Sequence, residues 1–349
     1  MAVTLAAAQL LRLPLLGVLF YSTADPEFNT TAPTGSLAGS GWELQGQWGD
    51  YTGTPIGPRY FITAQHVGGM PGDRFHFRGA DYVTAQFYDD PGSDLRIWKI
   101  RGQFAAYAPL YRSSNEVGRN LVVHGRGTQR GASLLANDGT GSSLKGWLWG
   151  SVDHRLRWGE NQVEQVIDLG SGPLMRMAFN AAAGANEAHL SIGDSGGGIF
   201  IKDGADWKLA GISYTVDGLY NTSNAGAGFN AAVFDERGLY RGTEGQWTLV
   251  GNAPASIPGG FYGTRISARA SWIDSILAQS SSGDTPVLQS TASLQAPFIH
   301  DPSGIVNEVE RRILVGLPSA ARFYRLGGAY PFRITRISVL GNQLSIAYE

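Results

Sequence analysis

The residues of this chain that could do chemistry gather in one glycine-rich segment, residues 193–198. Its sequence is Gly-Asp-Ser-Gly-Gly-Gly, and the strand-like run Ile-Phe-Ile follows. Glycine has no Cβ, so such a loop can adopt positive φ and bring backbone N–H groups close to a ligand. Ser195 would then expose its hydroxyl beside amide donors, as a nucleophile for acyl transfer requires. An ordinary glycine-rich hairpin turn is the alternative interpretation.

A serine nucleophile also needs a base, and the chain has 6 histidines. The hydroxyl stays weakly nucleophilic until a base takes its proton and a third group orients that base. His66 stands where a predicted strand ends, with small residues before it and two glycines after it. Four others lack such a setting and are interpreted as structural or solvated imidazoles: His76, His124, His154 and His300.

The segments that must position these residues read as short strands. Alternating or apolar runs occur at 41–48, 59–63, 74–78, 82–88, 95–100 and 121–124, and Gly- and Pro-rich turns separate them. Such spacing, in a chain with 48 glycines, predicts an all-β barrel or sandwich. One helix is predicted, over 267–277, where the apolar residues follow a 3.6-residue period.

Composition limits the kinds of partner that the protein could bind, and the N-terminal sequence indicates its compartment. The formal net charge of −2 gives no reason to expect a nucleic acid or an acidic membrane surface as partner. The absence of cysteine excludes disulfides, thiolate metal sites and cysteine nucleophiles. A short apolar run over 13–20 precedes Ser22-Thr23-Ala24, a small-x-small pattern typical of signal peptidase sites. The sequence therefore predicts a signal peptide over 1–24 and a secreted, periplasmic or cell-surface protein, with a buried N-terminal helix or a membrane tether as the alternatives.

A second boundary lies late in the chain. Residues 279–286 have the Ser- and Gly-rich composition of a flexible linker. Alternating runs beyond it predict a small β-rich module over 287–349. Attachment to a surface or matrix and a simple packed cap are both open for this module.

Three boxes in the order His, Asp, Ser resemble the trypsin-like (chymotrypsin-fold) serine proteases. Residues 63–66, Thr-Ala-Gln-His, resemble the histidine box, and Asp94 heads an alternating strand like the aspartate strand of that family. Residues 193–197 match the nucleophile box. Weaker similarities follow in the same order at 122–127, at 210–214 and at 264–273, so the resemblance covers about 41–277.

The resemblance implies a fold and a set of roles. The fold would be two six-stranded antiparallel β-barrels with a closing helix, within a protease domain over 25–278. Ser195 would be the nucleophile, His66 the general base and Asp94 the residue that orients it. Backbone N–H groups of Gly193 and Ser195 would form the oxyanion hole. The substrate would be a peptide or protein, with no cofactor or metal. Asp89 and Asp90 are the other candidates for the acid that orients His66. They lie in a turn with no alternating strand directly after them, so a solvated surface position suits them better.

The sequence departs from the family at several positions. Val67 replaces the usual cysteine after the histidine, and Gly198 stands where proline is more usual. No Ile-Val-Gly-Gly-like activation sequence lies upstream. His189 stands at the expected base of the specificity pocket, where trypsin-like members have Asp, and Ser213 lies in the expected substrate strand. A substrate-binding His189 and a satisfied structural histidine both remain open.

Two other functions compete with a serine endopeptidase. Residues 193–197 also satisfy the Gly-x-Ser-x-Gly elbow of α/β-hydrolases, in which the histidine follows the serine. Here only His300 follows Ser195, and a strand rather than a helix follows the serine. The second alternative is an inactive member of the family that binds peptide or protein. The presence of all three candidate residues counts against it, because inactive members usually lose the histidine or the serine.

Overall fold

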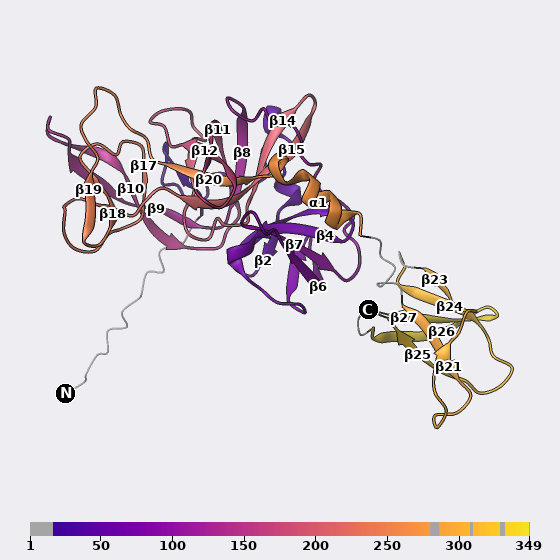
Figure 1. Cartoon of the computed structure of the whole chain (residues 1–349). Coiled ribbons are helices and arrows are strands. Elements are labelled where there is room, and N and C mark those ends of the chain that lie inside the picture. The colour runs from indigo at the N-terminus through magenta and orange to yellow at the C-terminus, as the bar shows by residue number, and fades with distance from the viewer. Residues whose placement is uncertain (1–16, 280–285, 308–309, 329–331, 349) are drawn as a thin grey trace, which may run out of the picture.

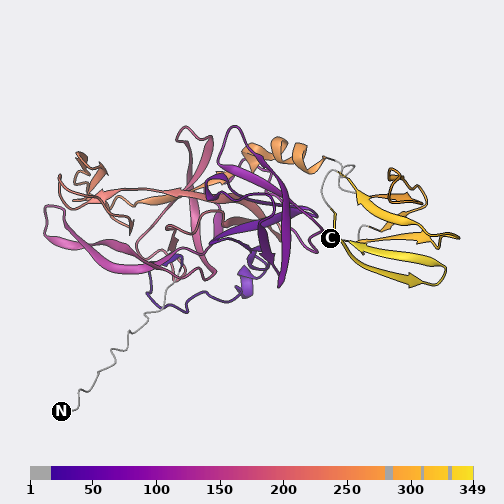
Figure 2. The ribbon, with the colours of Figure 1, turned by 90° about the horizontal axis from the view of Figure 1, so that it is seen from below.

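The computed structural model describes residues 17–279, 286–307, 310–328 and 332–348. Two closed six-stranded antiparallel barrels form the body, with a lobe of two small sheets beside one barrel and a C-terminal module at the opposite end (Figure 1; Figure 2). The predicted all-β fold with two barrels is therefore confirmed. Within the described residues, none of the helices has the length and apolar character that crossing a membrane demands.

Barrel 1 closes in the order β2-β3-β4-β7-β6-β5. Its strands are β2 Gly46–Trp48, β3 Tyr51–Gly57, β4 Tyr60–Ala64, β5 Arg74–Phe77, β6 Ala80–Asp89 and β7 Leu95–Ile100. The alternating sequence of β5 becomes alternating exposure, as a strand with one buried face requires. The predicted strand over 41–48 is wrong in its first half, where a 3-10 turn, Trp42–Leu44, precedes β2.

Barrel 2 closes in the order β11-β12-β20-β15-β14-β8. Its strands are β8 Asn120–Gly125, β11 Arg157–Asp168, β12 Pro173–Ala178, β14 Gly198–Asp203, β15 Asp206–Val216 and β20 Gly260–Arg265. Apolar side chains fill its interior, among them Val123, Met175 and Ile199, each fully buried. A second apolar cluster joins the barrels, because Ile62 and Ile97 of barrel 1 pack with residues of β14 and β15.

A lobe built from two insertions of barrel 2 has no counterpart in the sequence-based prediction. β9 Thr128–Asn137, β10 Ser142–Val152 and β17 Ala231–Val233 form one sheet of the lobe, and β16 Tyr220–Asn221, β18 Tyr240–Thr243 and β19 Gln246–Leu249 form another. Lys145 is fully buried between the carboxylates of Asp138 and Asp235, at 2.7 and 2.8 Å. Two carboxylates compensate the buried ammonium, which would otherwise be costly.

The predicted helix is present as a 3-10 turn, Ser267–Arg269, followed by α1 Ala270–Leu277. Ile273 and Ile276 of α1 pack into the cluster that joins the barrels. The C-terminal module has a three-stranded sheet, β22-β21-β25, and a four-stranded sheet, β23-β24-β27-β26. These strands are β21 Val287–Thr291, β22 Ile299–His300, β23 Ile305–Asn307, β24 Arg312–Gly316, β25 Phe323–Gly327, β26 Ile334–Leu340 and β27 Gln343–Tyr348. Most of the predicted linker, residues 280–285, lies outside the described residues.

The first described strand belongs to the folded core. β1 Leu19–Phe20 pairs with β13 Ala188–His189, and Val18 and Phe20 pack in the interior of barrel 2. The predicted leader over 1–24 thus covers residues 1–16, which lie outside the described residues, and residues 17–24, of which 17–20 are buried. Cleavage after Ala24 would remove β1 from the fold.

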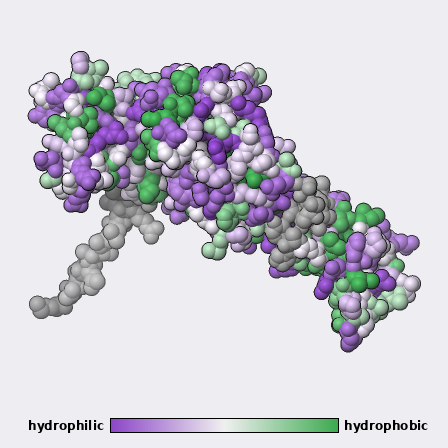
Figure 3. Space-filling model, in the orientation of Figure 1, coloured by the Kyte–Doolittle hydropathy of each residue, from purple (hydrophilic) through white to green (hydrophobic). Residues whose placement is uncertain are grey.

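Hydropathy on the face drawn in Figure 3 is mixed. Hydrophobic residues form small separate groups on the lobe, the barrels and the C-terminal module, among hydrophilic neighbours. Scattered exposed apolar residues of this kind are normal for a folded protein.

Candidate active site

The pairing of β4 with β7 brings His66 to Asp94. The register joins Ala64 to Leu95, and the 3-10 turn Gln65–Val67 carries the imidazole just past the end of β4. Asp94 immediately precedes β7, and its Oδ2 lies 2.6 Å from His66 Nδ1 while its Oδ1 accepts the His66 backbone N–H at 3.1 Å. Two bonds from one carboxylate fix both the backbone and the ring of His66.

Ser195 reaches the same place from the loop between β13 and β14. Its Oγ lies 2.8 Å from His66 Nε2. A carboxylate can only accept, so in the neutral imidazole Nδ1–H donates to Asp94 and Nε2 accepts the hydroxyl proton of Ser195. This is the arrangement in which a serine is activated as a nucleophile. The structure thus brings together the three residues predicted to act as acid, base and nucleophile.

Glycines fit the serine loop between the two barrels. A Cβ on Gly196, where φ is +78°, would lie 2.2 Å from both Thr52 O and Thr63 Oγ1 of barrel 1. A Cβ on Gly197 would lie 1.9 Å from His124 O of barrel 2. Real Cβ atoms do not approach so closely, so larger residues would push the loop away from one barrel or the other. The glycines of this box are therefore required by packing.

Two backbone donors flank the serine hydroxyl. Gly193, with φ of +94°, and Ser195 donate their N–H groups to no protein acceptor within the part of the chain that the structure describes. Buried or half-buried N–H groups normally find a partner, so a pair left available beside a nucleophile suits an incoming oxygen. Both are the residues predicted to form an oxyanion hole.

The side chain of Asp194 holds the serine loop in place. Its buried carboxylate accepts the N–H groups of Gly127 and Ser191, both at 2.7 Å, and the Ser191 hydroxyl at 3.0 Å. Burial raises the pKa of Asp194 to about 6 against the effect of these bonds. A Cβ on Gly17 would lie 2.7 Å from Gly127 N, so the segment leading into β1 packs directly against this anchor. Sequence reasoning found no such upstream segment.

Gln45 explains why glycine replaces proline at position 198. The Gly198 N–H donates to Gln45 Oε1 at 3.1 Å, and a proline there would have no hydrogen to donate. The Gln45 amide in turn donates to Gly41 O and Thr54 Oγ1, both at 3.2 Å. A side chain of barrel 1 thus holds the start of β14 in barrel 2.

The rival acids are engaged elsewhere. Asp89 binds Arg96 through two bonds of 2.6 and 2.8 Å. Asp90 is buried and pairs with Arg269, next to α1, which corrects the expectation of a solvated residue. Neither carboxylate contacts His66. Asp90 instead ties the turn that precedes Asp94 to the C-terminal helix region of the domain.

The two predicted substrate-binding residues lie in different places. Ser213 lines a cavity of about 10 Å³ beside Ser195, and its buried Oγ has no partner among the described residues. His189 does not line this cavity: it is buried between the rings of Phe179 and Phe261, and its Nδ1 bonds Leu190 O at 2.6 Å. Burial lowers the pKa of His189 to about 4, so it is a neutral, structural imidazole. The structural alternative of the sequence analysis therefore fits its position.

No protein-family model and no curated protein matches this chain. Among solved structures, the chain is similar to neuropsin, a serine protease expressed in the limbic system of mouse brain, at 14% sequence identity and a TM-score of 0.39; the match covers 68% of this chain and 96% of that one. The two closed six-stranded barrels have the architecture of the chymotrypsin-like fold, and this assignment does not depend on that similarity.

Proposed function

We propose that the protein is an exported serine endopeptidase that hydrolyses peptide bonds through an acyl-enzyme intermediate. The observation that supports it most directly is the hydrogen-bonded series from Asp94 through His66 to Ser195. The His66 side chain is 41% exposed and that of Asp94 is 12% exposed, so the base faces solvent and the orienting acid is covered. That is the division of exposure which attack on an external substrate requires.

The chemistry follows from these positions. Ser195 Oγ attacks the peptide carbonyl carbon as its proton passes to His66 Nε2. The carbonyl oxygen becomes an oxyanion, which the N–H groups of Gly193 and Ser195 would stabilise; removal of one such donor typically costs about 2.7–4 kcal/mol of barrier. His66 then gives its proton to the leaving amine. Water, deprotonated by the same imidazole, adds to the acyl group and releases the acid and the free serine.

Substrate backbone would bind along the end of β15. Residues 198–203 of β14 pair with residues 206–212 of β15, and beyond that point β15 pairs only with β20 within the described residues. Ser213 is still bonded on that side, because its C=O accepts the Gly196 N–H and its N–H donates to Gly197 O. Within the described residues, 214–216 therefore have one open edge beside Ser195, to which an extended peptide could add as a strand.

Small side chains are the expected preference at the residue before the scissile bond. The cavity beside Ser195 has room for about one water molecule. Its lining includes Asp194, whose carboxylate is already bonded by the loop, so the cavity presents no free charge. Alanine or glycine would fit there without rearrangement, and an Arg, Glu or Phe side chain would not.

Export and surface attachment complete the proposal. Export rests on the apolar N-terminal run over 13–20. Because Val18 and Phe20 of that run are buried in barrel 2, cleavage on export would have to lie before Val18. Attachment would be the task of the C-terminal module. Mass spectrometry of the protein recovered outside the producing cell would give its mature N-terminus. Full retention inside the cell would contradict export.

A fluorophosphonate probe tests the activity, because it labels only an activated serine. We expect labelling at Ser195 in the natural chain, none in Ser195→Ala, and unchanged labelling in the control Ser142→Ala on the lobe. In the same way, the natural chain and Ser142→Ala should hydrolyse members of a peptide library, and Ser195→Ala should not. A folded chain that binds peptides but is neither labelled nor hydrolytic would overturn the proposal in favour of an inactive peptide-binding protein.

A further inference from the structure

The strand edge proposed for substrate ends at a buried carboxylate. Asp217 directly follows residues 214–216 of β15, and its N–H donates to Gly260 O at 2.8 Å. Asp217 is 6% exposed, whereas residues 214–216 are half-buried. A buried charge needs partners, so the elements that carry those partners also fix the end of the substrate edge.

Three side chains from three different strands bind this carboxylate. Its Oδ1 accepts the hydroxyl of Tyr262 in β20 at 2.8 Å and Nη2 of Arg241 in β18 at 2.8 Å. Its Oδ2 accepts Nη2 of Arg176 in β12 at 3.1 Å. Tyr262 and Arg176 belong to barrel 2, but Arg241 belongs to the lobe. The lobe is therefore bonded directly to the end of β15.

Arg241 lies between two buried carboxylates. Its Nη2 bonds Asp217, and its Nη1 donates to Glu236 Oε2 at 3.3 Å. Glu236 is itself fixed, because its Oε1 accepts the Tyr220 hydroxyl at 2.7 Å and its N–H donates to Ile257 O at 2.7 Å. Burial, and to a smaller degree the charge of Asp217, raises the pKa of Glu236 against the attraction of Arg241. Without this guanidinium the two carboxylates would repel each other with less compensation.

The residues around the candidate nucleophile are held by other contacts. His66 and Ser195 are bonded to each other, and Asp194 holds the serine loop. Among the described residues, no hydrogen bond or ion pair joins Asp217 or Arg241 to any of these three. A change at Arg241 can therefore loosen the end of β15 and leave the geometry around Ser195 intact.

We propose that Asp217 is a positioning residue for substrate and that Arg241 keeps it in place, so that the lobe sets the affinity for extended peptides. This inference rests on the proposed endopeptidase function. A peptide adds to residues 214–216 only where their N–H and C=O groups stand at strand spacing. Fixing the strand beforehand reduces the ordering cost of binding. A substrate too short to reach residue 216 gains nothing from it.

Substrate length separates this role from a general effect on the fold. The p-nitroanilides of acetyl-alanine and acetyl-tetraalanine are hydrolysed by the natural chain and by Arg241→Gln, whose replaced side chain is 40% exposed. We expect KM of the long substrate to rise at least about fivefold, while its kcat and both constants of the short substrate change less than about twofold. Fluorophosphonate labelling of Ser195 should keep its rate. Arg241→Lys should recover part of the loss, because the charge stays and the fork is lost.

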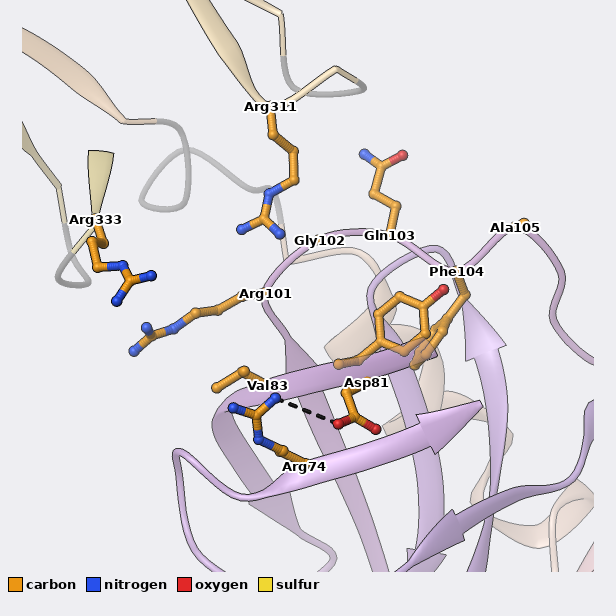
Figure 4. A pocket seen from close by; sticks show the side chains of 11 residues that line it. Arg74, Asp81, Val83, Arg101, Gly102, Gln103, Phe104, Ala105, Arg311 and Arg333 are labelled. Atoms are coloured by element: carbon orange, nitrogen blue, oxygen red, sulfur yellow. Dashed lines mark hydrogen bonds and ion pairs between the residues drawn. The ribbon is translucent and has the colours of Figure 1, made fainter. Parts of the chain in front are cut away.

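Two other arginines provide matched controls. Arg237→Gln removes a lobe guanidinium that bonds Asp235 through two contacts of 2.8 Å and does not contact Asp217. Arg74→Gln removes a guanidinium of barrel 1 that pairs with Asp81 at 3.4 Å, in a cavity beside β5 and β6 (Figure 4). Each control removes one positive charge, and we expect KM of either substrate to change less than about twofold.

An unchanged ratio of the two KM values in Arg241→Gln would overturn the proposal. So would an equal loss for both substrates together with slower labelling, because that is a general effect on the fold. Binding of fluorescein-labelled tetraalanine to Ser195→Ala, with and without Arg241→Gln, gives a readout that needs no hydrolysis. If the natural chain proves unreactive, a Kd that still weakens at least about fivefold supports the role of Asp217 while the enzymatic proposal fails. The absence of binding, or of weakening, contradicts that role.

Discussion

His66 Nε2 lies 2.8 Å from Ser195 Oγ, although 129 residues separate them and they enter the site from different barrels. Each barrel alone would present only part of the candidate site. Barrel 1 supplies the imidazole and its carboxylate, and barrel 2 supplies the hydroxyl and the two amide donors. The geometry of the junction between barrels is therefore the quantity on which reactivity depends.

Asp94→Asn should reduce kcat by about 10⁴-fold, because the amide can no longer hold the imidazole in the reactive tautomer. Asp89→Asn is the matched control: Asp89 is bonded to Arg96 and does not reach His66, so kcat should change little. Steady-state hydrolysis of one peptide by both variants measures this. A large loss in Asp89→Asn with activity retained in Asp94→Asn would reverse the assignment of the acid.

Gly196→Ala should cost about 3 kcal/mol or more of unfolding free energy and most of the activity. The new methyl would be strained at φ of +78° and would collide with Thr52 and Thr63. Gly204→Ala separates the two causes, since Gly204 has φ of +65° with nothing within 4 Å of its Cβ position. The control should lose only about 1 kcal/mol. Equal losses of unfolding free energy in urea for the two variants would show that the close fit of Gly196 against Thr52 and Thr63 is unimportant.

Removal of residues 1–24 should destabilise barrel 2 severely, and by much more than removal of residues 1–16, which keeps β1 in place. The longer deletion takes away Val18, Leu19 and Phe20, which are 2%, 0% and 3% exposed. Burial of each such side chain is worth about 1.5–3 kcal/mol, so the sum rivals the stability of a whole domain. Thermal unfolding of the two truncated chains measures the difference. Identical curves would mean that β1 contributes nothing.

The Glu187 carboxyl should make stability fall as pH rises. Burial raises its pKa to about 7 from 4.5, so the folded state binds this proton more tightly than the unfolded chain. The resulting stabilisation is complete below pH 4.5 and is lost as the pH passes through about 7. His124 and His189 act in the opposite sense below pH 6.5, because burial lowers the pKa of each to about 4.

A comparison with Glu187→Gln isolates this carboxyl from the histidines. Between pH 4.5 and pH 8 the variant should gain about 3 kcal/mol of unfolding free energy relative to the natural chain. Denaturant unfolding of both proteins across this range gives the difference. A constant difference would show that Glu187 titrates alike in the folded and unfolded states.

Local sequence predicts the strands and the three candidate residues of the site well, because the signals for both lie in residues that are neighbours along the chain. The alternation of 74–78 fixes the buried face of β5, and the small residues before His66 mark the end of β4. Asp94 could be preferred over Asp89 because an alternating strand follows it directly. These signals need no knowledge of distant parts of the chain.

The features that sequence reasoning missed are those made by distant residues. Asp90 looked like a turn residue, and it is buried because Arg269, 179 positions later, meets it. The bond from Gly198 to Gln45 spans 153 positions, and no local pattern announces it. His189 occupied the expected position in the sequence, but it is buried on β13, which pairs with β1, between the rings of Phe179 and Phe261.

The serine loop seated between the barrels has a consequence for dividing the protein. A fragment that ends before β8 would hold His66 and Asp94, and the complementary fragment would hold Ser195, so each would be inert toward an organophosphate. Mixed together, they would regain reactivity only by reassembling around Gly196 and Gly197. If the proposed activity holds, the protein could be converted into a complementation reporter, in which labelling of Ser195 signals that two polypeptides have joined.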